Sequence, residues 1–247
     1  MCSIIAGRNS KAAGRLRHGK ERKVTAGYKP KVLRNGECMV KVKICGLTDP
    51  CEADYVNEAG ADYAGMILFV PKSKRNISIA RAKEILSRLD PQIASVAVTV
   101  CPQEEQIRAI EEAGFTYLQV HGTISRELLD TMRIPVLKAF NVSDLSEYEF
   151  YHSHPKVAGY VFDAQTPGSG QLFDWSLLEA FPRDNKPALL AGGLTPENVG
   201  EAIRCTRIYG ANTSSGVERA DGKGKSRERI LAFVKAARLA GGTEESM

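Results

Sequence analysis

The chain has 247 residues, of which 43% are hydrophobic, and its 34 basic and 29 acidic residues give a net charge of +5. This length and composition can bury one large core, and no run approaches the roughly 18 apolar residues of a membrane span or the apolar segment of a secretion signal. We therefore expect one soluble, cytoplasmic domain with no membrane partner. The six cysteines lack the spacing of a zinc site, so we expect reduced thiols and no metal.

The excess positive charge lies in the first 38 residues. This segment carries ten Lys or Arg and two acidic residues and has no apolar periodicity, whereas the rest of the chain has 24 basic and 27 acidic residues. We expect residues 1–38 to be a disordered basic extension before a domain at 39–241, with a short tail at 242–247. The extension fits an upstream start ahead of Met39, a solvated tail, or a targeting or nucleic-acid arm. Since the body is slightly acidic, we expect no nucleic-acid partner.

The first predicted strand places a single thiol at its end. From Val40 onward, apolar residues alternate with Lys41 and Lys43, and the Gly46–Pro50 turn follows Cys45. Cys45 is therefore the last residue of the strand. In parallel α/β folds, the carboxyl ends of the strands form the rim where chemistry takes place.

Apolar runs and helical patterns then alternate about every 25 residues, which indicates repeated β-α units. The expected strands are Val40–Cys45, Tyr63–Leu68, Ile93–Val100, Tyr117–Val120, Pro135–Phe140, Ala158–Phe162, Ala188–Ala191 and Arg207–Ala211. The expected helices are Pro50–Glu58, Ile79–Arg88, Glu104–Ala113, Ser125–Met132, Asp144–Tyr151, Trp175–Glu179, Thr195–Arg204 and Arg227–Leu239, with one further turn at Ser214–Val217. Eight alternating pairs favour a single (β/α)8 TIM barrel of the α/β class. Neither a G-x-G-x-x-G nor a Walker lysine loop is present to support a nucleotide fold.

Two glycine- and serine-containing segments near the C-terminus are typical of a phosphate site. Gly192 and Gly193 follow the seventh strand, and Ser214 and Ser215 follow the eighth. Barrels often bind phosphate between these two loops, through backbone N–H groups that can approach an anion closely. Each motif alone also fits an ordinary turn or helix cap. Because both occur at the expected positions, we favour a phosphate site.

Four further residues are candidates for chemistry at the same rim. A thiolate at Cys45 and a carboxylic acid at Asp163, after the sixth strand, could move a proton between adjacent carbons of a sugar. An inert buried cysteine and a loop-capping aspartate are the alternatives. Arg75 could pair with a substrate carboxylate or be a solvated charge. His121 could polarise a substrate carbonyl, although we favour a structural role.

Read together, the motifs resemble phosphoribosylanthranilate isomerases, a family of the tryptophan pathway. The resemblance runs from Val40 to Phe233, and its parts are VKICGLTD, EAGADYAGMIL with SKRNIS, LQVHG, FDA with GSGQLFDW, LAGGLTPENV and SSGVE. It implies a closed barrel and an Amadori rearrangement of N-(5-phosphoribosyl)anthranilate, an internal redox step that needs no cofactor. Both a monomer and a homodimer stay open.

The resemblance also implies roles for residues at matching positions. Cys45 corresponds to the general base, Asp163 to the general acid, and Arg75 to the residue that binds the anthranilate carboxylate. The positions that correspond to the phosphate-binding loops are Gly192, Gly193, Ser214 and Ser215.

This chain departs from the family pattern at three places. Gln171 stands where the family usually has a lysine, Asn212 and Thr213 stand where it has Asp and Val, and the usual Phe of the third strand is replaced in VAVTVCP. Gln171 and Asn212 remain polar and could still hydrogen-bond a substrate, so we expect changes in affinity and substrate range.

Two other functions are compatible with the motifs. Another phosphosugar isomerase or epimerase on the same barrel would be expected to use paired aspartates, whereas strand one ends here in Cys45. A non-catalytic binding protein that acts through its extension would lose function when residues 1–38 are deleted. An enzyme would keep its turnover after that deletion.

Overall fold

The computed structural model describes residues 40–141, 146–163 and 186–241. The strands are β1 Lys41–Cys45, β2 Tyr63–Leu68, β3 Asn76–Ile77, β4 Ala94–Val100, β5 Tyr117–His121, β6 Val136–Asn141, β7 Val157–Asp163, β8 Ala188–Leu190 and β9 Gly210–Thr213. The helices are α1 Pro50–Ala59, α2 Ile79–Leu86, α3 Glu104–Glu112, α4 Arg126–Thr131, α5 Tyr148–His152, α6 Val199–Thr206 and α7 Arg227–Gly241, with a 3-10 turn, η2, at Ser215–Val217.

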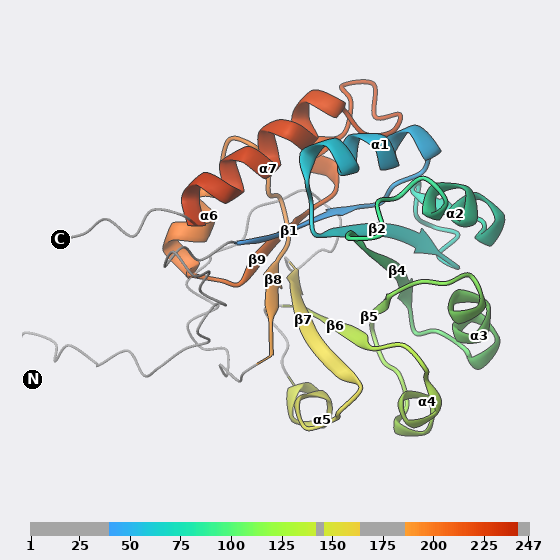
Figure 1. The fold of residues 1–247 in the computed structure, drawn as a ribbon. Helices are drawn as coiled ribbons and strands as arrows, with labels where there is room; N and C mark the ends of the chain where they lie inside the picture. The colour runs from blue at the N-terminus through green and yellow to red at the C-terminus, as the bar shows by residue number, and fades with distance from the viewer. Residues whose placement is uncertain (1–39, 142–145, 164–185, 242–247) are drawn as a thin grey trace, which may run out of the picture.

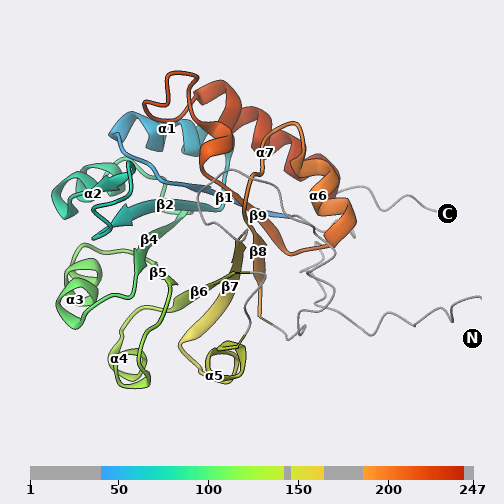
Figure 2. The same cartoon turned by 180° about the vertical axis from the view of Figure 1, so that it is seen from behind.

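Eight of the described strands form a closed parallel barrel. They pair in the order β1, β9, β8, β7, β6, β5, β4, β2, and a further pairing of β1 with β2 closes the ring. The helices surround the strands in both axial views (Figures 1 and 2). The predicted TIM barrel is confirmed. Among the described residues, no helix is long and apolar enough to cross a bilayer.

Both faces of the strands are buried, as the sheet of a closed barrel requires. One face packs under the helices in a large cluster that includes Val42 and Ile44. The other face lines the inside of the barrel, where Cys45 packs with residues such as Val161 and Leu189. Alternation along β1 therefore separates the outside of the barrel from its interior, and Lys43 points inward with no exposed surface.

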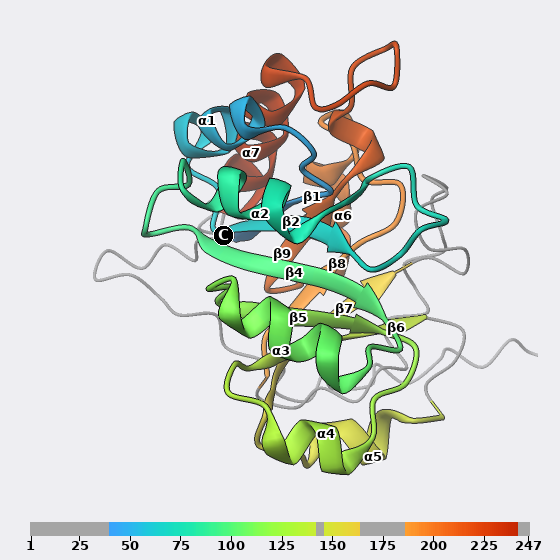
Figure 3. The ribbon, with the colours of Figure 1, turned by 90° about the vertical axis from the view of Figure 1, so that its right-hand side faces the viewer.

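The carboxyl ends of the strands meet at one rim. In Figure 3 the arrowheads of β2 and β4 point to the same side, where the loop after β2 and the loop before α7 also lie. The first turn of this rim is held by a capping box at α1. The Asp49 side chain accepts from Cys51 N at 3.0 Å, and Glu52 Oε2 accepts in return from Asp49 N at 3.3 Å and also from Thr48 N at 2.6 Å.

β3 lies between the strand expected at Tyr63–Leu68 and the helix expected at Ile79–Arg88, where we predicted no further element. It pairs with Ile67 and Leu68 of β2, beyond the last β1–β2 pair at Cys45 and Gly65. β1 ends before β2 does, so the free edge of β2 is covered by two residues of the returning chain. Such a short pairing leaves no periodic pattern in the sequence.

Two boundaries near the C-terminus differ from the prediction by three residues or more. α6 begins at Val199 instead of Thr195. Thr195 opens a separate turn before the helix, in which its side-chain Oγ1 accepts from Glu197 N at 3.3 Å. The eighth barrel strand begins at Gly210 instead of Arg207. Arg207 has a left-handed backbone and caps α6 through a 2.8 Å bond to the Ile203 carbonyl.

Several expected features lie outside the described residues. They are the extension at 1–38, the helix at 175–179, the loop containing Gln171, the tail at 242–247 and the first residues of the helix expected from 144.

Candidate active site

The proposed acid and base end two strands of the same barrel. Cys45 is the last residue of β1 and is 6% exposed, and Asp163 is the last residue of β7. Because all barrel strands are parallel, both residues lie at the carboxyl-end rim. Cys45 belongs to the interior cluster of the barrel. Asp163 lies two residues beyond Val161 of the same cluster, so it shares the inward-facing side of β7.

A buried lysine that sequence reasoning did not select lies beside Cys45. A Cβ placed on Gly65 would lie 2.8 Å from Cys45 Sγ and 2.9 Å from Lys43 Nζ, so the absence of a side chain at Gly65 makes room for both groups. Sγ and Nζ are therefore less than about 6 Å apart, which is the sum of those two distances. Lys43 Nζ donates to Asn212 Oδ1 at 2.9 Å. The thiol and the amine therefore share one buried corner of the barrel interior.

The predicted phosphate loops form one small pocket together with Asp163. Its lining includes Gly192 and Gly193 after β8, and Asn212, Ser214 and Ser215 at the end of β9. The two glycines have φ angles of 88° and 64°, a left-handed backbone that glycine adopts without strain.

The two phosphate loops are in direct contact with each other. Thr213 Oγ1 donates to the Leu194 carbonyl at 2.7 Å, and a Cβ on Gly216 would overlap that same carbonyl oxygen. Asn198 Nδ2 also donates to the Gly193 carbonyl at 3.0 Å. Gly216 is thus required by the close approach of the SSG loop to the GGL loop.

Arg75 lies at the end of the β2–β3 loop and faces the first turn of the rim. A Cβ on Gly46, directly after Cys45, would lie 2.6 Å from Arg75 Cδ and 2.9 Å from Ser214 Oγ. The predicted carboxylate-binding arginine and the predicted phosphate-binding serine therefore meet at the residue that follows the thiol.

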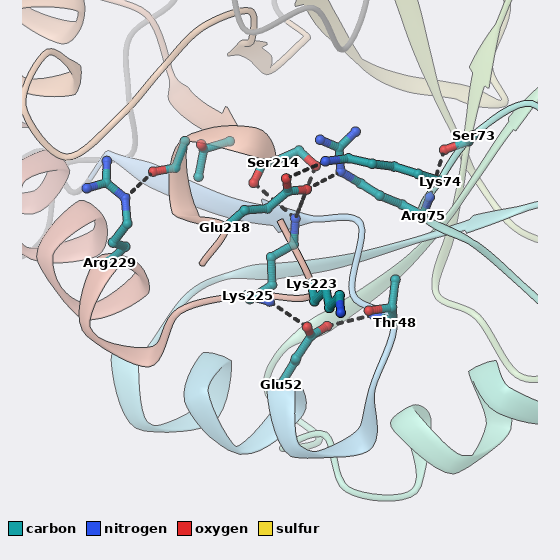
Figure 4. Close-up of polar contacts among 12 residues, drawn as sticks. Thr48, Glu52, Ser73, Lys74, Arg75, Ser214, Glu218, Lys223, Lys225 and Arg229 are labelled. Carbon is teal, nitrogen blue, oxygen red and sulfur yellow. Dashed lines mark hydrogen bonds and ion pairs between the residues drawn. The ribbon is translucent and has the colours of Figure 1, made fainter. Parts of the chain in front are cut away.

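Arg75 is held by an acidic residue that sequence reasoning did not select. Its Nε donates to Glu218 Oε1 at 2.5 Å, and Lys74 Nζ donates to Glu218 Oε2 at 2.8 Å (Figure 4). Burial opposes ionisation of Glu218, but the hydrogen bonds from Arg75 and Lys74 and the charge of Lys225 outweigh it and lower the pKa of the carboxyl. No described residue accepts from the two terminal nitrogens of Arg75, which are thus available to a ligand.

His121 ends β5 and hydrogen-bonds to another side chain of its own strand. Its Nε2 lies 2.8 Å from Gln119 Nε2, which can only donate, so the ring accepts there and is neutral. Burial and the charges of Lys43 and Lys138 lower the pKa of His121 to about 4. Its substrate-binding role stays a prediction.

The described residues contain no cluster of three or more His, Cys, Asp or Glu side chains with the arrangement of a metal site. The groups that converge on the rim are a thiol, a carboxyl, cationic side chains and the backbone of the loops at Gly192–Gly193 and Ser214–Ser215. This set can bind an anionic ligand at two points and exchange protons with it.

Comparison with known proteins identifies the family. The family described as N-(5'phosphoribosyl)anthranilate (PRA) isomerase matches residues 42–236. An N-(5'-phosphoribosyl)anthranilate isomerase of Hyphomonas neptunium is 39% identical over 211 residues, which cover 81% of this chain and 98% of that protein.

Solved structures agree with this result. The phosphoribosyl anthranilate isomerase of Thermotoga maritima superposes with a TM-score of 0.72 at 36% identity, over 81% of this chain and 100% of that one. A phosphoribosyl anthranilate isomerase in complex with reduced 1-(o-carboxyphenylamino)-1-deoxyribulose 5-phosphate has a TM-score of 0.69 at 35% identity, over 81% and 100% of the two chains. The chain belongs to the N-(5'-phosphoribosyl)anthranilate isomerase family.

Proposed function

We propose that Cys45 and Asp163 are the general base and general acid of the family's reaction in this chain. As a member of the family, the chain is an isomerase of tryptophan biosynthesis. The reaction converts N-(5'-phosphoribosyl)anthranilate into 1-(2-carboxyphenylamino)-1-deoxyribulose 5-phosphate. The observation that carries the assignment is the position of the thiol and the carboxyl at the ends of β1 and β7, on the rim where the anion-binding groups converge.

The proposed steps balance without an external oxidant. Asp163 protonates the furanose ring oxygen, the bond from C1 to that oxygen breaks, and a Schiff base forms between C1 and the anthranilate nitrogen. Cys45 then removes the proton from C2, which gives an enolamine. Tautomerisation to the ketone completes an aldose-to-ketose shift, in which C1 is reduced and C2 is oxidised.

Two anchors align the substrate with these groups. The backbone of the GG and SSG loops holds the phosphate, and the terminal nitrogens of Arg75 hold the anthranilate carboxylate in a bidentate pair. With both ends fixed, binding energy brings C1 and C2 to the acid and the base. The pocket that joins Asp163 to Gly192, Gly193 and Ser215 supports the phosphate end of this arrangement.

Lys43 supports the role of Cys45 as a base. Its ammonium is fully buried within about 6 Å of the thiol and has a neutral amide oxygen of Asn212 as its hydrogen-bond partner. A nearby positive charge favours the thiolate, which is the form that removes protons. Asn212, at the position where the family pattern has an aspartate, adds no negative charge to offset this effect.

The test follows loss of the fluorescence of freshly prepared phosphoribosylanthranilate. Cys45→Ser and Asp163→Asn should each lower kcat by orders of magnitude, with near-normal binding of the reduced product analogue. Cys51→Ser, which changes an exposed thiol on α1, is the matched control and should keep full turnover. Full turnover of Cys45→Ser would show that another group is the base.

We also propose that the substrate is a small molecule handled without nucleic acid. Two features support this: the anion-binding groups form pockets at the barrel rim, and they lie within the described body of the chain. If deletion of residues 1–38 abolished turnover, the extension would have to be part of the machinery.

A further inference from the structure

The carboxylate of Glu218 is shared by three cationic side chains from two separate segments. Arg75 and Lys74 approach it from the β2–β3 loop, and Lys225 approaches from the segment before α7, with Nζ 3.5 Å from Glu218 Oε1. Figure 4 shows the three side chains pointing at the one carboxylate. Glu218 therefore joins two loops that are about 150 residues apart in the sequence.

Lys225 extends this network to the proposed phosphate end. Its Nζ donates to the Ser214 carbonyl at 3.0 Å and lies 3.3 Å from Ser214 Oγ. Its side chain is only 1% exposed, and burial lowers the pKa of its ammonium to about 8 against the attraction of Glu218. The lysine is thus firmly enclosed between the carboxylate and the loop.

The network is anchored to the first turn of the barrel. Lys225 N donates to Glu52 Oε1 at 2.6 Å, and the other oxygen of Glu52 accepts from Thr48 N at 2.6 Å. Glu52 is itself buried. Thr48 lies in the turn that follows Cys45. The same set of bonds therefore connects Arg75 and the loop at Ser214 to β1, the strand that carries the thiol.

We propose that Glu218 and Lys225 are positioning residues that set the distance and angle between the carboxylate-binding Arg75 and the phosphate-binding loop at Ser214. The proposal rests on the proposed function of these two anchors. A bond from Nε to Glu218 fixes the plane of the guanidinium and directs its terminal nitrogens away from the carboxylate. This arrangement selects a substrate that carries an aryl carboxylate and a phosphate at one fixed distance from each other.

Binding of two ligands distinguishes positioning from simple charge. Isothermal titration is carried out with the reduced product analogue and with the same compound lacking the carboxylate. Glu218→Gln should weaken the carboxylated ligand about tenfold and change the other less than about twofold. Removing a negative charge beside Arg75 would by itself strengthen anion binding, so a weaker carboxylated complex reports lost orientation.

Lys225→Met and a matched control complete the set. Lys225→Met should weaken both ligands, because it releases Ser214 as well as Glu218. Glu58→Gln is the control: Glu58 makes an exposed ion pair with Arg227, and the substitution changes the net charge by the same amount. It should leave both affinities unchanged. Turnover is measured in parallel, and Glu218→Gln should lower kcat/KM for phosphoribosylanthranilate about tenfold.

Each outcome decides the proposal. Equal weakening of the two ligands by Glu218→Gln, or no weakening, would overturn it. If Glu218→Gln does not fold, Glu218→Asp keeps the charge but shortens the reach. The same selective loss is then expected, and an equal loss overturns the proposal. The proposed function fails separately, when the unmodified protein neither binds the carboxylated ligand nor turns over the substrate.

Discussion

Replacement of Lys43 by Met separates stability from activity. The change removes an ammonium that is fully buried inside the barrel and keeps a side chain of similar length. It leaves Asn212 Oδ1 without its lysine donor at 2.9 Å, which costs about 1 kcal/mol. It also removes the desolvation penalty of a buried charge, which is several kcal/mol. We expect the free energy of unfolding to stay unchanged or to rise by about 1–3 kcal/mol.

Activity should move in the opposite direction. Nζ of Lys43 and Sγ of Cys45 are less than about 6 Å apart, because each lies within 3 Å of the Cβ position of Gly65. At an effective dielectric constant of about 20, a positive charge at this distance stabilises a thiolate by roughly 3 kcal/mol. Loss of this attraction for negative charge on the sulfur should lower kcat between about 10- and 100-fold.

The assay measures the thiol directly. Iodoacetamide reacts with the thiolate, and peptide mass spectrometry gives the alkylation rate of Cys45 separately from the exposed cysteines. Lys43→Met should slow alkylation of Cys45 at pH 7 by about the same factor as kcat. Lys41→Met is the control, because Lys41 lies on the same strand but pairs with Asp62 at 2.5 Å. Equal alkylation rates in the two variants would refute the electrostatic argument.

Three further outcomes are expected. Gly216→Ala should raise KM more than tenfold or lower the thermal midpoint by several degrees, since its methyl group overlaps the Leu194 carbonyl; substrate saturation curves and thermal unfolding measure both effects. His121 has a pKa of about 4 in the folded chain and near 6.5 when unfolded, so protonation below pH 6.5 favours the unfolded state and stability falls down to pH 4. Between pH 6.5 and 4, denaturant unfolding should show that His121→Gln loses up to about 3 kcal/mol less stability than the unmodified protein. Equal losses of stability in the two proteins would contradict the assignment. Deletion of residues 1–38 should leave kcat/KM within about twofold in the fluorescence assay.

Much of the barrel could be predicted because its units are local. The β-α alternation depends on neighbouring residues, and the strand ends at Cys45 and Asp163 are confirmed. The predicted element boundaries were wrong where contacts with distant segments set them. The two-residue β3 exists because β2 extends past β1, and β9 begins at Gly210 because Arg207 is needed to end α6.

The site divides in the same way. Types of residue at strand ends indicated a thiol, an acid, an arginine and phosphate loops, and sequence similarity linked them to a family. Lys43 shares the face of Cys45 on β1, but lysines that alternate with apolar residues are also the pattern of a half-exposed strand, and only the tertiary structure shows that this lysine is fully buried. The bonds from Glu218 to Arg75 and from Lys225 to Ser214 depend on which loops the closed ring brings together, and only the tertiary structure determines that arrangement.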